Sequence, residues 1–250
     1  MLSKNTVKFI KSLQQKKFRK QENSFFVEGA KNVTELLNSE YEITHLLFTD
    51  SFKDLHWSLI KRCGAEKHEV TAKQLESIGS FQTNEAAIAV AKIKNNLSIE
   101  INIDELAIAL DDVRDPGNLG TIIRIADWYG IKKIILSENC ADIYNPKVLN
   151  SSMGSFTRVA FFYTDLKKFF PMIDAPIYGA LLEGDNIYNS PLSNNGIILM
   201  GNESKGISDE LLPFVSHKIT IPQFGQAESL NVAIATAVIC DNFRRKSWEK

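Results

Sequence analysis

Apolar and polar positions alternate in a regular order along the second half of the chain. The run AIALDDV predicts a strand, TIIRIADWYG a helix and KKIILS a second strand, with the turn RDPGNLG after the first strand. A strand, a helix and a strand in this order form a βαβ unit, which requires a parallel sheet. Further on, GIILM is apolar throughout, as in strands buried on both faces, and SDELLPFV is interpreted as a helix. The second half therefore predicts an α/β domain built on a parallel sheet.

The first half contains shorter elements in a similar alternation. FFVEG predicts a strand that turns at Gly29 into a helix, THLLFTD a second strand, LHWSLIKRC a helix and AAIAVAKI a closing strand. The polar stretch KNNLSIEINID separates this pattern from the next one. We therefore predict a small α/β domain over residues 1–95, a linker over 96–103 and a second domain over 104–250.

A segment near the C-terminus joins a polar loop directly to an apolar helix. IPQFGQAESLN runs without a break into VAIATAVIC. Ser229 is a suitable N-cap, because its hydroxyl can accept from the free N–H groups of the first turn. A helix that is apolar on all sides is normally buried on all sides. We therefore expect the preceding loop to lie in the interior or at a tight interface, where a bound ligand is one candidate partner for its backbone groups.

The helix predicted after RDPGNLG has two different faces. Its apolar positions share the face expected to pack on the sheet: Leu119, Ile122, Ile123 and Ala126. The opposite face carries Thr121, Arg124 and Trp128. Large aromatic side chains are enriched at protein interfaces. We interpret this face as a contact with another subunit, with Arg124 at the interface.

Charge adds a candidate surface for phosphate groups. The 250 residues are 44% hydrophobic and 24% charged, as in ordinary globular proteins. The net charge of −1 is unevenly distributed, because residues 1–20 hold seven basic residues and no acidic one, whereas the remainder holds 22 basic and 30 acidic residues. Such a basic segment can contact phosphates, with a solvated helix face as the alternative. The candidate residues for this contact are Lys4, Lys8, Lys11, Lys16 and Arg19.

Other classes of protein are disfavoured. The chain has no apolar run of about 20 residues and no signal-peptide core at its start, so we expect a cytoplasmic protein without a membrane segment. The three cysteines and four histidines share no motif, so we expect neither a metal site nor a catalytic triad. The dinucleotide fingerprint and the Walker loop are also absent.

Three polar, glycine-containing loops follow predicted strands: DDVRDPGNLGTIIR, LMGNESKGIS and IPQFGQAESLN. Ligands of open α/β sheets bind beyond the carboxyl ends of the strands, so these loops are expected to line one site. The acidic residues Asp111, Asp112 and Asp115 of the first loop are interpreted as strand-end solvation, in preference to a magnesium site.

These loops resemble the three motifs of the SpoU-type (TrmH-like) RNA ribose 2′-O-methyltransferases of the SPOUT superfamily. The matching stretches are NLGTIIR, GNESKG and IPQFGQAESLNVAIA, and KVLNSSMGS is similar to the family's segment between the first two motifs. The resemblance covers about residues 104–246. The first half, with FFVEG, resembles the ribosomal-protein-like substrate-binding domain that precedes the motifs in many members, although TNEAAIAVA stands where members often have a Gln-Gly pair.

The resemblance implies a fold, a cofactor and a reaction. The fold is a SPOUT parallel-sheet domain with a deep trefoil knot, the cofactor is S-adenosylmethionine, and the assembly is a homodimer. The reaction is methylation of a ribose 2′-hydroxyl in RNA, with ribosomal RNA favoured by the two-domain layout. The implied catalytic residues are Arg124, Asn118, Glu203, Ser229 and Asn231. The implied cofactor-binding residues are Leu199, Gly201, Asn202, Gly206, Ile221, Leu230 and Ser229.

The role of Arg124 needs a physical qualification. The resemblance assigns it to activation of the 2′-hydroxyl, yet a guanidinium with a pKa above ~12 is a poor base. We therefore expect Arg124 to bind and orient the hydroxyl and the adjacent phosphate. Three alternatives stay open: a tRNA 2′-O-methyltransferase, a non-catalytic dimeric RNA-binding protein, and a protein that binds a phosphorylated small molecule in the same loops.

Overall fold

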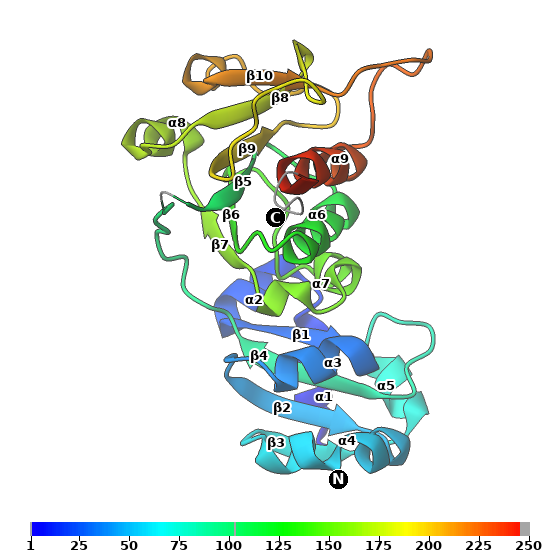
Figure 1. The fold of residues 1–250 in the computed structure, drawn as a ribbon. Coiled ribbons are helices and arrows are strands. Elements are labelled where there is room, and N and C mark those ends of the chain that lie inside the picture. Colours follow the sequence, from blue (N-terminus) through cyan, green and yellow to red (C-terminus); the bar gives the residue numbers. More distant parts are fainter. Residues whose placement is uncertain (1, 103, 246–250) are drawn as a thin grey trace. The chain divides into compact units, whose positions relative to one another are not determined.

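The computed structural model describes residues 2–102 and 104–245, which form two compact units (Figure 1). The first unit comprises Met1–Asn95 and Asp142–Thr157, and the second comprises Asn96–Ala141 and Arg158–Lys250. Residues 142–157, which the sequence analysis placed in the second domain, therefore pack with the first unit. The described residues contain no helix that is long and apolar enough to cross a membrane.

The first unit is built on a four-stranded mixed sheet. The strand order is β1-β4-β2-β3, with β4 antiparallel to both of its neighbours and β2 parallel to β3. The strands are β1 (Ser24–Glu28), β2 (Ile43–Phe48), β3 (Glu66–Glu69) and β4 (Ala87–Lys92). The strands β1, β2 and β4 carry the apolar runs from which strands were predicted.

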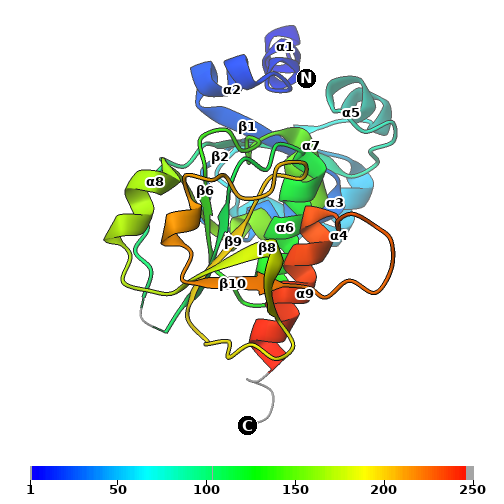
Figure 2. The same ribbon diagram turned by 90° about the horizontal axis from the view of Figure 1, so that it is seen from above.

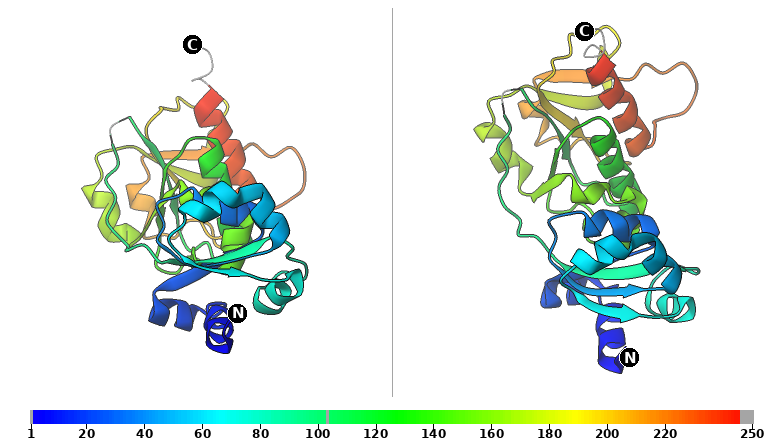
Figure 3. Two further views of the ribbon diagram at one scale, coloured as in Figure 1. Left: turned by 90° about the horizontal axis from the view of Figure 1, so that it is seen from below. Right: turned by 60° about the horizontal axis from the view of Figure 1, so that its bottom comes forward.

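Helices cover both faces of this sheet (Figure 3). They are α1 (Lys4–Ser12), α2 (Lys16–Glu22), α3 (Ala30–Leu37), α4 (Asp50–Arg62) and α5 (Ala72–Ile78). On one face, α1 and α5 bury apolar side chains such as Ile10 and Leu75 against Phe26 and Leu47 of the strands. On the other face lie α3 and α4. The lysines of α1 remain exposed because its apolar side chains point to the sheet.

Residues 142–157 are fastened within the first unit by polar and aromatic contacts. They contain α7 (Pro146–Ser152) and η1 (Ser155–Thr157). The Asp142 carboxylate pairs with the buried Arg19 guanidinium at 2.8 Å. The Phe25 ring of β1 lies 4.6 Å from the ring of Tyr144 and 6.0 Å from that of Phe156, measured between centroids. The segment thus completes the core of the first unit.

The second unit is an α/β domain with a parallel sheet, as predicted. The six strands lie in the order β10-β8-β9-β5-β6-β7, and all neighbours are parallel. The strands are β5 (Leu106–Leu110), β6 (Lys133–Leu136), β7 (Ala160–Tyr163), β8 (Ile177–Asn186), β9 (Gly196–Met200) and β10 (His217–Thr220). The central strands β5 and β9 are buried along their whole length. This burial explains their unbroken apolar sequences.

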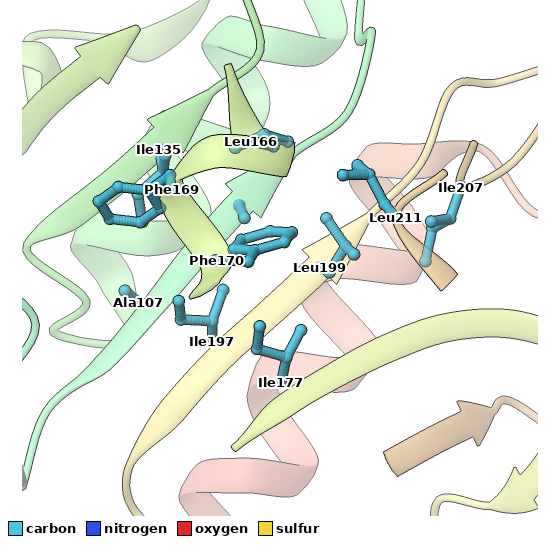
Figure 4. Close-up of a cluster of buried hydrophobic side chains, with 11 residues drawn as sticks. Ala107, Ile135, Leu166, Phe169, Phe170, Ile177, Ile197, Leu199, Ile207 and Leu211 are labelled. Atoms are coloured by element: carbon cyan, nitrogen blue, oxygen red, sulfur yellow. The ribbon is translucent and has the colours of Figure 1, made fainter. Parts of the chain in front are cut away.

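Helices cover both faces of the parallel sheet (Figure 2). They are α6 (Pro116–Trp128) and α9 (Val232–Arg245) on one face, and α8 (Leu166–Phe169) with η2 (Phe170–Met172) on the other, while η3 (Leu212–Phe214) precedes β10. Figure 4 shows Leu166, Phe169 and Phe170 lying over side chains of the central strands. The helices α6 and α9 pack against each other. Their buried face includes the four residues predicted for α6: Leu119, Ile122, Ile123 and Ala126.

Two elements differ from the sequence prediction. The stretch SDELLPFV forms only the short 3₁₀ helix η3, because Pro213 has no N–H and its ring obstructs a continuing α-helix. The C-terminal helix begins at Val232, later than predicted, and the preceding residues 223–231 are exposed in the chain. The loop therefore does not lie in the interior of the chain, and its place at a tight interface stays a prediction. One reason is that α9 is not buried on all sides, since Ile234 is 55% exposed.

Candidate functional site

The three motif loops leave the same edge of the parallel sheet. From β5 the chain moves to β6 and β7 on one side, and later returns to β8, β9 and β10 on the other side. The border between β5 and β9 is therefore the point where the strand order reverses. Crevices beyond the carboxyl ends of strands at such a point are the usual ligand sites of open α/β sheets. The sequence and the topology thus indicate the same edge.

The loop after β5 is held by its own acidic residues. The Asp111 carboxylate accepts from the Ser208 N–H at 2.8 Å, and Asp115 caps α6 by accepting from the Asn118 N–H at 2.8 Å. Asp112 has a left-handed backbone, with φ of 59°, a conformation that Asp tolerates better than most residues. Its N–H donates to the Ser137 hydroxyl at 2.8 Å. The interpretation as strand-end solvation is therefore wrong for Asp111, which is buried, whereas Asp115 is exposed.

The loop after β9 is closed by the side chain of Asn202. Its Nδ2 donates to the carbonyl of Asp112 at 2.8 Å, and its Oδ1 accepts from the N–H groups of Ser204 and Lys205 at 3.0 and 3.1 Å. Asn202 also pairs through its backbone with Gly206. The Asn202 side chain is therefore engaged in shaping the loop and in joining it to the loop after β5. The sequence predicted a cofactor contact here and gave no signal of this internal role.

Gly201 lies where two backbone segments nearly touch. A Cβ atom at this position would stand 2.1 Å from the carbonyl carbon of Gly206 and 2.2 Å from the nitrogen of Ile207. No side chain fits into such a space, so Gly201 allows the loop to fold back on itself. Gly206 has a left-handed φ of 70°. The two glycines define a tight backbone cradle next to the site.

A pair of hydrogen bonds joins all three motif loops at one point. Nδ2 of Asn118 donates to Oε1 of Glu203 at 3.0 Å, and Oδ1 of Asn118 accepts from Nδ2 of Asn231 at 2.9 Å. The three residues are separated by 85 and 113 positions in sequence. Three of the five predicted catalytic residues therefore contact one another directly, with Asn118 in the middle.

Asn231 has a second role at the start of α9. Its Oδ1 accepts from the N–H groups of Ala233 and Ile234 at 3.0 and 3.4 Å. This is N-capping geometry, so Asn231 and not Ser229 caps the helix. Ser229 lies two residues earlier in the exposed loop. The single Asn231 side chain thus fixes both the helix start and the contact to Asn118.

A cavity of about 660 Å³ lies between β8, the loop after β9 and the loop after β10, and no described residue of the loop after β5 lines it. Its volume falls within the roughly 300–1,000 Å³ range of small-molecule sites. Aliphatic residues such as Leu181, Ile219 and Ile239 form part of the lining. Residues 180–184 of β8 bulge at this place, because the pairing with β10 jumps from Gly179 to Asp185. The bulge supplies one wall of the cavity.

Most of the predicted cofactor-binding residues line this cavity. They are Gly201, Asn202, Gly206, Ile221, Ser229 and Leu230, and Glu203 lines it as well. Leu199 does not, since it is fully buried within β9 between Ala109 and Gly179. The backbone cradle at Gly201, the apolar walls and the polar rim suit a ligand with an aromatic and a charged part. This arrangement fits S-adenosylmethionine.

Arg124 lies on the exposed side of α6, as the helical wheel predicted. It does not line the cavity of its own chain, and its guanidinium has no hydrogen bond or ion pair with the described residues. Trp128 on the same side is 84% exposed. Arg124 is therefore free to bind a group that approaches from outside.

The predicted RNA-binding residues are not equivalent. Lys4, Lys8, Lys11 and Lys16 are exposed, whereas Arg19 is only 2% exposed. Besides pairing with Asp142, Arg19 donates to the carbonyls of Leu13 and Gln14, each at 2.9 Å. The prediction for Arg19 is corrected: its guanidinium holds the corner between α1 and α2 and is not available to a phosphate.

Fold and site together define an α/β protein with a small-molecule cavity at the switch point of its parallel sheet. The chain matches the model of the SpoU rRNA Methylase family over residues 105–241, and residues 4–89 match the MRM3-like substrate binding domain. It is 30% identical over 245 residues to the 23S rRNA (guanosine(2553)-2′-O)-methyltransferase RlmP of Bacillus subtilis, covering 95% of each chain.

Solved structures show the same relationship over the whole chain. A TrmH-family protein from Porphyromonas gingivalis is 36% identical, with a TM-score of 0.85 and coverage of 98% of this chain and 99% of that one. An AdoMet-bound rRNA methyltransferase from Sinorhizobium meliloti is 29% identical, with a TM-score of 0.86 and coverage of 98% and 96%. The chain belongs to the SpoU rRNA methylase family, which confirms the resemblance stated from its sequence.

Proposed function

We propose that this protein transfers a methyl group from S-adenosylmethionine to a ribose 2′-hydroxyl of ribosomal RNA. The observation that carries the proposal is the contact of Asn118 with Glu203 and Asn231 at the edge of a cavity of cofactor size. Family membership supports the reaction type. The relatives named as 23S rRNA methyltransferases support ribosomal RNA over tRNA.

The cavity is the proposed cofactor site. When bound, the cofactor supplies an electrophilic methyl group on a sulfonium. The aliphatic wall would enclose its adenosine part, and the open space at Gly206, where a Cβ would meet nothing within 4 Å, would admit it close to the backbone. The polar rim of Glu203 and Ser229 would face its charged part. We also propose that the C-terminal segment forms the trefoil knot typical of the family.

Arg124 is the proposed catalytic contact with RNA. Its unpaired guanidinium presents donors in a fixed fork that suits a phosphate or a ribose hydroxyl. Binding energy is then used to hold the hydroxyl in line with the methyl group. Such positioning can lower the activation barrier by several kcal/mol. The hydrogen bonds of Asn118 with Glu203 and Asn231 would hold the surrounding loops in one arrangement during this alignment.

A homodimer is proposed from the exposed apolar surface of α6 and α9. Trp128 is 84% exposed and Ile234 is 55% exposed, on two helices that pack together. Covering such side chains is favourable by about 25 cal/mol per Å² of apolar surface. Light scattering at micromolar concentration tests this proposal, and Trp128→Glu should yield a monomer. A monomeric wild-type protein would contradict it.

The test of the proposed function is methyl transfer from tritiated cofactor to an unmodified 23S rRNA transcript. The wild-type protein should label the RNA, and mapping should place the methyl group on a ribose. Arg124→Ala should reduce the rate by at least about 100-fold, as for loss of a transition-state donor, and should leave cofactor affinity within threefold in calorimetry. A folded wild-type dimer that binds RNA but neither binds the cofactor nor labels RNA would favour a non-catalytic RNA-binding protein.

A further inference from the structure

Phe224 is the most exposed large apolar side chain among the described residues, with 95% of its surface accessible. Burying a phenylalanine side chain is worth roughly 1.5–3 kcal/mol relative to leaving it in water. Because Phe224 is exposed, the folded chain does not gain this burial free energy. Such exposure indicates that the ring meets something outside the chain.

The surroundings of Phe224 place it at the site. It lies in the loop between β10 and α9, which arches away from the sheet (Figures 1 and 3). The loop is shaped by Gln223, whose Nε2 donates to the carbonyls of Gly225 and Ala227 at 2.9 and 3.0 Å. Among the described residues that line the cavity, Phe224 is the only aromatic one. The ring therefore belongs to the outer rim of the cavity.

The inner part of the cavity already has apolar surface of its own. Ile219, Val232 and Ile239 are buried aliphatic side chains that line it. They can enclose the adenosine of a bound cofactor without help from an exposed ring. Phe224 is thus left for a second, outer ligand.

Lys205 provides a complementary group on the neighbouring motif loop. It lines the same cavity and is exposed, and its ammonium makes no ion pair or hydrogen bond with the described residues. An aromatic face and a free cation at one rim match the two parts of a single-stranded nucleotide. Bases stack on aromatic rings, and phosphates bind lysine.

We propose that Phe224 stacks against the base of the nucleotide that presents its 2′-hydroxyl, while Lys205 binds a neighbouring phosphate. The inference rests on the proposed function. Proteins that recognise RNA in single-stranded loops splay the bases out and stack them on aromatic side chains. Phe224 supplies that surface at the outer rim of the cavity and makes the enzyme select an unpaired nucleotide.

The experiment measures kcat/KM for methylation of the unmodified 23S rRNA transcript at several salt concentrations, with cofactor affinity measured by calorimetry. Phe224→Ala and Phe224→Leu should lower kcat/KM by roughly 5- to 150-fold, since stacking on an aromatic ring has about this effect. Phe224→Trp should retain the wild-type value. Cofactor affinity should stay within threefold in all three variants, because the ring lies outside the aliphatic wall.

Lys205→Gln separates the two contacts. It should reduce the slope of log kcat/KM against log salt by about 0.7, the value for one phosphate contact to a single strand. Phe224→Ala should leave that slope unchanged. Tyr188→Ala is the matched control, because Tyr188 is a half-exposed aromatic residue of the same unit that does not line the cavity. It should stay within twofold of the wild type.

Several outcomes would overturn the inference. If Phe224→Ala weakens cofactor binding in step with kcat/KM, the ring contacts the cofactor. If it dissociates the dimer in light scattering, the ring belongs to the subunit interface. If the wild type is active and Phe224→Ala is unaffected, this inference is refuted while the proposed function stands. A wild type that binds cofactor but methylates no RNA would remove the proposed function and this inference with it.

Discussion

Replacing Asn118 by alanine tests whether the three motif loops act as one site. The substitution removes two hydrogen bonds, the donation to Glu203 at 3.0 Å and the acceptance from Asn231 at 2.9 Å. A hydrogen bond to a charged group contributes about 1.5–3 kcal/mol, and one between neutral groups about 0.5–1.5 kcal/mol. Both bonds are exposed to solvent, so water replaces much of each when it is lost.

The expected effect is therefore larger on catalysis than on stability. The free energy of unfolding should fall by less than about 1 kcal/mol, because water can solvate the exposed groups. Methyl transfer needs the loops in one arrangement. If their mispositioning raises the activation free energy by about 2–3 kcal/mol, the rate falls roughly 30- to 150-fold. Single-turnover transfer from tritiated cofactor measures this rate, and calorimetry checks that cofactor still binds.

A double-mutant cycle gives the sharpest control. Asn118→Ala and Glu203→Ala each break the same hydrogen bond, so their combined effect should be smaller than the sum by about 1–2 kcal/mol. Asn118→Asp keeps the acceptor for Asn231 but turns a carboxylate toward Glu203, so it should be no more active than Asn118→Ala. Additive effects of the two alanine substitutions, or a single-turnover rate within threefold of wild type, would refute the reasoning.

Three further substitutions or measurements probe other parts of the structure. Gly201→Ala places a Cβ into facing backbone, so calorimetry should detect at least tenfold weaker cofactor binding. Arg19→Met leaves Asp142 without its partner, so urea unfolding should show a loss of about 2–4 kcal/mol. Burial raises the pKa of Cys140, and it raises that of Cys240 to about 12. Mass spectrometry after iodoacetamide at pH 8.5 should therefore find native protein alkylated only at Cys63, which is partly exposed. Because the folded state keeps the Cys240 proton, the free energy of unfolding should also fall as pH rises above about 9.

The strands and the main helices follow from local sequence patterns. The apolar runs of β5 and β9 and the two faces of α6 were predictable because burial in a parallel sheet leaves a strong periodic signal. The place of residues 142–157 was not predictable in this way. Their contacts, such as Arg19 with Asp142 and Phe25 with Tyr144, join positions far apart in sequence. A local pattern contains no information about such partners.

The same limit explains the mixed outcome for individual side chains. The sequence identified Asn118, Glu203 and Asn231 as site residues, but the hydrogen bonds between them depend on the fold. Arg19 was assigned by its charge and turned out to be buried. Asn202 was assigned by its motif, and its side chain proved to be engaged within the loops. Residue type and spacing predict which segments form the site, whereas burial and pairing decide what each side chain does.

The topology explains why these particular loops meet. Parallel strands place all their carboxyl ends at one edge, and the reversal of strand order between β5 and β9 leaves their loops without a helix crossing between them. Two short hydrogen bonds then fix the loops after β5 and β9 to each other, one between Asp111 and Ser208 and one between Asn202 and Asp112. The third loop is attached mainly through Asn231 and is otherwise exposed. The loop after β9, held against the loop after β5, can therefore form one fixed side of the cofactor cavity. The exposed loop forms the other side and, because it carries Phe224, is the part of the site best placed to meet a large RNA substrate.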